Sequence, residues 1–196
     1  MSALRVEDVT VGFGGRLALD GVTLAAEPGT ITGLIGPNGA GKTTLFNVIC
    51  GLQPCTGGLV HIGERDVTAL PPFKRARHGL ARTFQRLELF GLLTVRENVR
   101  LAAQVAGNVD PDATAAALLG RLGIAPLAEA RADRLPTGQA RLVELARAVA
   151  TDPTVLLLDE PASGQDESET AAFADVLRRW RPTASRWCSW STTCSS

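Results

Sequence analysis

The stretch from Gly36 to Thr44 constrains this chain more than any other feature. It reads Gly-Pro-Asn-Gly-Ala-Gly-Lys-Thr-Thr and matches the pattern G-x-x-x-x-G-K-[ST] completely. An apolar run at Ile31–Ile35 precedes it, which we expect to be a buried strand, and apolar residues at helical spacing follow over Thr43–Leu52. The order of strand, glycine-rich loop and helix predicts a loop whose backbone N–H groups point inward at phosphate oxygens, at the positive end of a helix.

The side chains of this phosphate loop predict a nucleotide triphosphate with Mg²⁺. Lys42 would supply a point charge to the β- and γ-phosphates, and the Thr43 hydroxyl would be a Mg²⁺ ligand. The alternative is a chance glycine turn before a helix, which the flanking strand and helix argue against. The residues expected to contact the phosphates are Gly36, Pro37, Asn38, Gly39, Ala40, Gly41, Lys42, Thr43 and Thr44.

A second apolar run, Val155–Leu158, ends in two carboxylates. Its length and composition are typical of a buried parallel strand, and ligands of open parallel sheets lie at the carboxyl ends of the strands. Asp159 could hold Mg²⁺ through water, and Glu160 could polarise the water that attacks the γ-phosphate. Alone, such a pair is often a solvated turn, but its position downstream of a phosphate loop favours the catalytic interpretation.

The rest of the chain predicts one α/β domain. Leu4–Val11 alternates apolar and polar residues, Leu17–Ala25 is a second apolar stretch, and residues 94 to 150 are mostly helical in pattern. Strands that alternate with helices indicate a parallel sheet. The 196 residues carry a formal net charge of zero, which gives no electrostatic reason to expect nucleic acid as a partner. We expect a cytoplasmic protein, since no signal peptide or membrane span is evident, and the four cysteines have no metal-ligand spacing.

Taken together, the motifs resemble the ATP-binding cassette (ABC) family. The segment from Leu135 to Gln139 resembles the family signature Leu-Ser-x-Gly-Gln and opens a predicted helix over Ala140–Ala150. The resemblance implies that Gln85 is the Q-loop glutamine, which reaches Mg²⁺ and senses the membrane subunits. It also implies that Phe13 stacks on adenine. The residues implied to face the ATP of a second subunit are Leu135, Pro136, Thr137, Gly138, Gln139 and, in the D-loop, Asp166.

The resemblance also implies an architecture and a set of partners. We expect an ABC ATPase domain over residues 1–179, with a RecA-like parallel sheet, an N-terminal antiparallel β part and an inserted helical subdomain at about 87–145. The C-terminal part of the family fold would be missing. The expected partners are a second ABC ATPase subunit in a homo- or heterodimer, permease subunits and, through them, a solute-binding protein. The chain would lie on the inner face of the cell membrane.

One subfamily is favoured within this resemblance. The segments Ala81–Gln85, Leu89–Phe90 and Thr94–Val99 look like the ATPase subunits of branched-chain amino-acid importers. Relatives of that group serve amides or urea, so the substrate stays open. The side chains of Leu87, Leu89, Phe90 and Leu92 could be core residues or could line a groove that receives a helix of a membrane subunit.

Two departures from the family pattern affect the expected activity. Pro136 replaces the signature serine, whose hydroxyl would hydrogen-bond the γ-phosphate. The family's switch histidine is also missing, because no histidine follows the acidic strand. Residues 180–196 contain all three tryptophans and two of the four cysteines, and no acidic residue follows Asp175. We predict that this tail is foreign to the domain and supplies no core strand to the sheet.

A frameshift is our hypothesis for residues 180–196, against the alternative of a divergent tail. Arginine outnumbers lysine 18 to 2, which indicates GC-rich codons. Written in such codons and read one base earlier, the tail becomes a valine- and leucine-rich run followed by Glu-His-Asp.

The function that the motifs and the resemblance lead us to expect is ATP binding and hydrolysis for an importer. The alternatives are a non-hydrolysing nucleotide-binding remnant and a non-transport cytosolic ABC ATPase.

Overall fold

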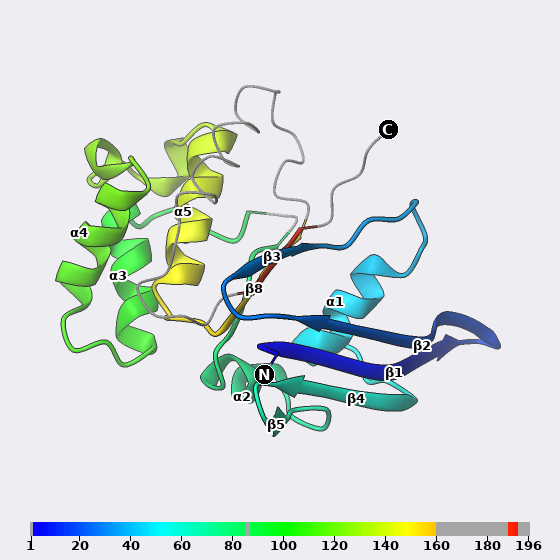
Figure 1. Cartoon of the computed structure of the whole chain (residues 1–196). Helices are drawn as coiled ribbons and strands as arrows, with labels where there is room; N and C mark the ends of the chain where they lie inside the picture. The colour runs from blue at the N-terminus through cyan, green and yellow to red at the C-terminus, as the bar shows by residue number, and fades with distance from the viewer. Residues whose placement is uncertain (1, 85–86, 160–187, 192–196) are drawn as a thin grey trace. The chain divides into compact units, whose positions relative to one another are not determined.

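The structure is a computed structural model that describes residues 2–84, 87–159 and 188–191 (Figure 1). The chain forms two compact units. The first contains the described residues 2–82, 153–159 and 188–191, and the second contains the described residues 83, 84 and 87–152. The first unit carries both β-sheets, and the second is helical.

An antiparallel sheet is built from the N-terminal third of the chain, in the order β2-β1-β4-β5. The strands are β1 (Leu4–Phe13), β2 (Arg16–Ala26), β4 (Gly57–Ile62) and β5 (Arg65–Asp66). Leu4, Val6, Val9 and Val11 of β1 are buried, and the predicted alternation is interrupted by a register shift between Val6 and Val9, where Asp8 has a positive φ. The expected N-terminal antiparallel part is confirmed.

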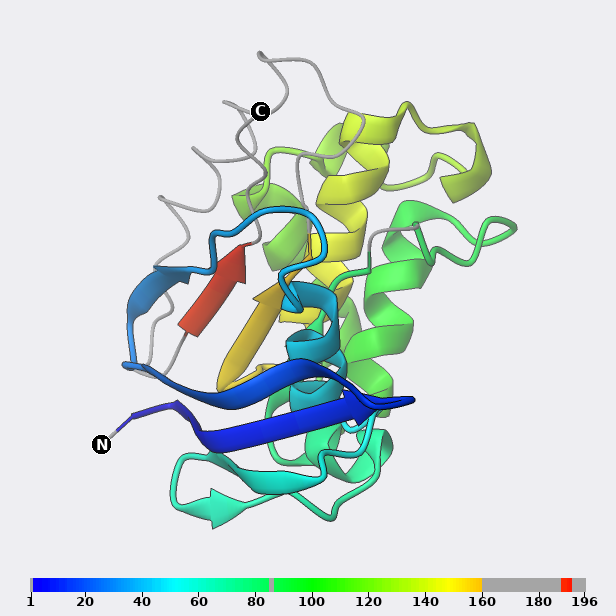
Figure 2. The same cartoon turned by 90° about the vertical axis from the view of Figure 1, so that its right-hand side faces the viewer.

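A parallel sheet has the order β3-β8-β7-β6, with β3 at Thr30–Gly33, β6 at Leu80–Arg82 and β7 at Val155–Leu158. The strand β8 (Cys188–Ser191) pairs in parallel with β3 and β7, and Figure 2 shows it in red beside β7. Our prediction that the tail supplies no core strand is therefore wrong. Its backbone can complete the ladder between β3 and β7 because strand hydrogen bonds come from main-chain groups, whatever the side chains.

One core joins the two sheets of this unit. The helix α1 (Lys42–Cys50) contributes the buried side chains of Leu45, Phe46, Val48 and Ile49 to the same cluster as β1, β4 and β7. All four residues of β7 are buried, as the sequence predicts. A short helix, α2 (Pro72–Arg77), precedes β6. The prediction that Ile31–Ile35 is buried is wrong, since Ile31 is 59% and Ile35 75% exposed. In the part of the sheet that the structure describes, β3 is an edge strand, which explains the exposure.

The second unit contains three helices, α3 (Val95–Val105), α4 (Pro111–Arg121) and α5 (Thr137–Val149), with 3-10 turns at Ala125–Leu127 and Ala132–Arg134. The helix α3 begins at a capping box, in which the Thr94 and Glu97 side chains each accept from the other's backbone N–H. The predicted break near Gly107–Pro111 separates α3 from α4. Among the described residues, no helix combines the length and apolar character that a membrane span requires.

Candidate nucleotide-binding site

The phosphate loop connects β3 to α1, as the sequence predicts. Gly39 and Gly41 have φ angles of +82° and +84°, which L side chains rarely adopt. A Cβ on Gly41 would lie 2.5 Å from the Ala18 carbonyl oxygen, so that close approach to β2 also requires glycine. Among the described residues, no side chain caps the N-terminus of α1. The helix start is therefore open to an anion, which its backbone N–H groups and dipole would stabilise.

Lys42 lies across this loop. Its Nζ donates to the carbonyl oxygens of Gly36 at 2.5 Å and Pro37 at 2.9 Å. These two bonds hold the ammonium group at the main chain of the loop, where the sequence predicts the β- and γ-phosphates. A phosphate oxygen, being negatively charged, would give the ammonium group an ion pair in place of bonds to neutral carbonyls.

Asp159 directly follows β7 and is 6% exposed. Its Oδ2 accepts from Arg82 Nη2 at 2.7 Å, and both side chains are 8% exposed. Arg82 also donates from Nη1 to Asn47 Oδ1 of α1 at 2.8 Å, and its guanidinium carbon lies 5.7 Å from the centroid of the Phe46 ring. One arginine of β6 therefore connects the acidic strand to the helix that follows the phosphate loop.

Sequence reasoning missed Arg82 as a member of the site. The sequence signal was a basic residue at the end of an apolar segment, but that signal specifies no partner. The parallel pairing of β6 with β7, which aligns Arg82 with Leu157, brings the guanidinium group to Asp159. Such a pairing cannot be read from local sequence.

The predicted Mg²⁺ ligands fit the chemistry of that ion. Thr43 offers a hydroxyl on the first turn of α1, and Asp159 offers a carboxylate at the carboxyl end of β7. Within the described residues, no group of three or more histidine, cysteine or acidic side chains could hold a metal by itself. A hydroxyl and a carboxylate suit Mg²⁺, which keeps waters and takes its other ligands from phosphates.

The remaining predicted site residues lie in different parts of the chain. Phe13 ends β1, and its side chain is 51% exposed, as a ring that stacks on a base must be. The signature-like segment leads into α5 in the second unit, with Pro136 at the N-cap and no side-chain cap. Three predicted residues, Gln85, Glu160 and Asp166, lie outside the described residues.

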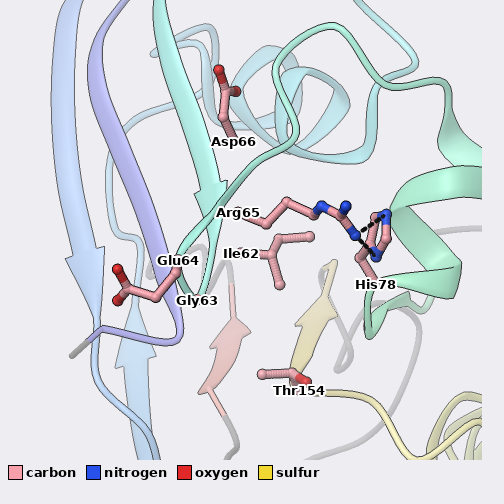
Figure 3. Close-up of a pocket in the computed structure, with 7 residues that line it drawn as sticks. All are labelled: Ile62, Gly63, Glu64, Arg65, Asp66, His78 and Thr154. Carbon is pink, nitrogen blue, oxygen red and sulfur yellow. Dashed lines mark hydrogen bonds between the residues drawn. The ribbon is translucent and has the colours of Figure 1, made fainter.

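A pocket of the first unit lies elsewhere. Its lining comes from the β4–β5 turn, with Glu64 and Arg65, and from His78 and Thr154, which precede β6 and β7 (Figure 3). Arg65 Nη1 lies 3.2 Å from both ring nitrogens of His78. No phosphate-loop residue lines this pocket, so it is separate from the predicted nucleotide site.

A phosphate loop, a following helix and a buried acidic strand in one parallel sheet define a P-loop nucleotide-binding protein. Residues 19–163 match the family described as ABC transporter, and the chain belongs to that family. It is 41% identical to an uncharacterized ABC transporter ATP-binding protein of Rhizobium meliloti, over 87% of this chain and 64% of the relative. It is 39% identical to the high-affinity branched-chain amino acid transport ATP-binding protein BraF of Pseudomonas aeruginosa, over 91% of this chain and 76% of the relative. The chain thus spans less than two thirds of the first of these relatives.

Other similarities are consistent with the same family. The lipopolysaccharide export system ATP-binding protein LptB of Escherichia coli is 34% identical, over 92% of this chain and 76% of LptB. The solved structure of MJ1267 in its ADP conformation, an ATP-binding cassette of an ABC transporter, superimposes with a TM-score of 0.86 at 28% identity. That match covers 100% of this chain and 83% of MJ1267. The expected fold class is confirmed.

Proposed function

We propose that this chain binds Mg²⁺-ATP and hydrolyses it to energise an importer of branched-chain amino acids or similar small polar solutes. The observation that carries the proposal is the placement of the phosphate loop and Asp159 after β3 and β7, two strands of one parallel sheet. Ligands of such sheets bind at this edge. The name of BraF, a high-affinity branched-chain amino acid transport ATP-binding protein, supports the importer assignment.

In the proposed reaction, the loop amides and Lys42 hold the triphosphate, and Phe13 stacks on the adenine. Mg²⁺, when bound, neutralises charge that develops on the phosphates. The proposed ligands of that ion are Thr43, Asp159 and Gln85, and Glu160 would accept a proton from the attacking water. The ion pair with Arg82 orients the Asp159 carboxylate.

The proposed working form is a dimer of ATPase subunits on two permease subunits, at the cytoplasmic face of the membrane. The segment Leu135–Gln139 and Asp166 would complete the ATP site of the second subunit. Pro136 cannot donate the hydroxyl bond expected of the usual serine, so the backbone N–H groups at the start of α5 would contact the γ-phosphate instead.

Hydrolysis and transport test this proposal together. The parent chain should release phosphate from MgATP, and Glu160→Gln should bind ATP without turnover. Vesicles that contain the chain, permease subunits of a branched-chain amino-acid importer and a solute-binding protein should accumulate labelled leucine. Turnover that is equal in the parent and Glu160→Gln would contradict the assignment of the catalytic carboxylate. Turnover without uptake of any amino acid would favour an export role like that in the name of LptB.

A non-hydrolysing remnant is the second candidate, and the composition of residues 180–196 favours it. We propose that this tail arises from a frameshift. The strand β8 ends at Ser191, which pairs with Leu158, the residue before Asp159. The alternative reading frame would place its valine- and leucine-rich run across β8 and its histidine directly after that strand, where the family needs one. The coding DNA tests this directly, since codons for residues 189–193 that do not give Leu-Val-Glu-His-Asp in the shifted frame would exclude the frameshift.

A further inference from the structure

The signature-like segment opens α5, and three charged residues further along this helix have no role in the proposed chemistry. They are Arg141, Glu144 and Arg147, spaced at i, i+3 and i+6. Arg141 and Glu144 are 6% and 5% exposed, and Arg141 Nη1 lies 3.1 Å from Glu144 Oε2. Burial of a charged pair on a helix is costly unless further hydrogen bonds satisfy it. The partners of the pair therefore indicate what it does.

Those partners are backbone groups of one residue. The Phe84 N–H donates to Glu144 Oε1 at 3.3 Å, and the Phe84 carbonyl oxygen accepts from Arg141 Nη1 at 2.7 Å. Both polar groups of Phe84 are therefore held by the pair. The carbonyl belongs to the peptide bond that joins Phe84 to Gln85, the predicted Q-loop residue.

Two more anchors follow along the same segment. Arg147 Nη1 donates to the Glu88 carbonyl oxygen, and its guanidinium carbon lies 4.8 Å from the centroid of the Phe90 ring. The Asn98 side chain of α3 is fully buried, accepts from the Phe90 N–H and donates to the Phe90 carbonyl oxygen, both at 3.0 Å. Phe84 and Phe90 are thus each held through both of their backbone polar groups.

These anchors hold main chain and leave apolar side chains exposed. Phe84 is 41%, Leu87 38%, Phe90 49% and Leu92 79% exposed. Large apolar side chains are more often buried in folded proteins. Here the opposite arrangement gives an apolar surface on a backbone that is tied to α5 and α3.

We propose that Arg141, Glu144 and Arg147 are positioning residues for the ATPase, which fasten Phe84, Glu88 and Phe90 to α5. A displacement of the exposed apolar side chains is then transmitted to α5 and to the signature-like segment at its N-terminus. The first statement stands on the contacts alone, and the second rests on the proposed function. The inference adds a role to three residues outside the predicted site.

Hydrogen exchange on the full chain tests the fastening. In Glu144→Leu, the Phe84 amide loses the Glu144 acceptor and Arg141 loses its ion pair with Glu144, so exchange over residues 83–91 should rise about tenfold or more. Glu144→Gln keeps an acceptor oxygen and should restore most of the protection. The matched control is Glu129→Gln, which removes an exposed ion pair to Arg96 in the same unit and should change nothing. Unchanged exchange over 83–91 in Glu144→Leu would overturn the proposal.

If Glu144→Leu does not fold, Arg147→Met provides a second test, because this substitution leaves the buried pair of Arg141 and Glu144 intact. It should raise exchange around Glu88 and lower kcat for ATP, while KM for ATP changes less than about twofold, because the phosphate loop is untouched. An unchanged kcat together with raised exchange would refute the transmission to the signature-like segment. Absence of ATP binding by the parent would instead refute the proposed function and leave the exchange result standing.

Discussion

Replacing the buried Arg75 with methionine should strongly destabilise the first unit. Arg75 lies on α2 and is 3% exposed. Its guanidinium group donates to four carbonyl oxygens. The acceptors are Leu70 at 2.8 Å, Val48 at 2.6 Å, Ile49 at 2.8 Å and Thr68 at 2.7 Å.

Two of these acceptors, Val48 and Ile49, belong to the last turn of α1, where the Val48 carbonyl also accepts from the Gly51 N–H at 3.0 Å. Arg75 therefore caps the helix that follows the phosphate loop. Burial lowers the pKa of the Arg75 guanidinium below its usual value, but an arginine stays charged. Hydrogen bonds from a charged donor are worth about 1.5–3 kcal/mol each, while removal of the cation recovers several kcal/mol of desolvation. We expect a net loss of about 3 kcal/mol in the free energy of unfolding.

The assay is urea unfolding followed by circular dichroism. With a slope of about 2 kcal/mol/M, the midpoint for Arg75→Met should fall by about 1.5 M. Arg77→Met is the matched control, because Arg77 lies on the same helix, is exposed and has only its guanidinium carbon 5.8 Å from the Phe73 ring centroid. The control should lie within about 0.5 kcal/mol of the parent. A loss below about 1 kcal/mol in Arg75→Met would refute the capping argument.

Three further predictions concern the site and α5. Gly41→Ala should weaken ATP binding about tenfold or more, since a Cβ would collide with the Ala18 carbonyl oxygen, whereas equal affinity by calorimetry would refute the steric argument. A double-mutant cycle of Arg82→Met and Asp159→Asn should give a coupling energy in unfolding of about 1–3 kcal/mol, and additive losses would contradict the buried ion pair. Burial raises the pKa of Glu144 against the opposing effects of the Phe84 N–H and Arg141. The contribution of protonated Glu144 to stability is complete below the pKa of the unfolded state and is lost as pH rises through the pKa of the folded state. As pH falls from 7 to 4.5, the free energy of unfolding of the parent should therefore rise relative to that of Glu144→Gln.

The phosphate loop, β7 and α5 could be predicted because each depends on local pattern. Gly41 needs a positive φ wherever this loop forms, and the apolar run before Asp159 needs burial whatever surrounds it. The motif spacing then identified the family without any knowledge of the sheet order.

Other features depend on contacts between distant segments. Arg82 meets Asp159 only because β6 pairs with β7, and Phe84 meets Glu144 across 60 positions of the sequence. The strand β8 was missed because its sequence lacks the apolar pattern on which strand prediction rests. Ile31 was expected inside because apolar content alone does not say whether a strand lies at an edge.

The ATP affinity of Lys42→Ala tests the central claim most directly. Titration calorimetry with MgATP should show binding by the parent chain and by Glu160→Gln, and no measurable binding by Lys42→Ala. Circular dichroism should show that all three proteins are equally folded. If Lys42→Ala bound MgATP as tightly as the parent, the nucleotide would not be held by the loop between β3 and α1.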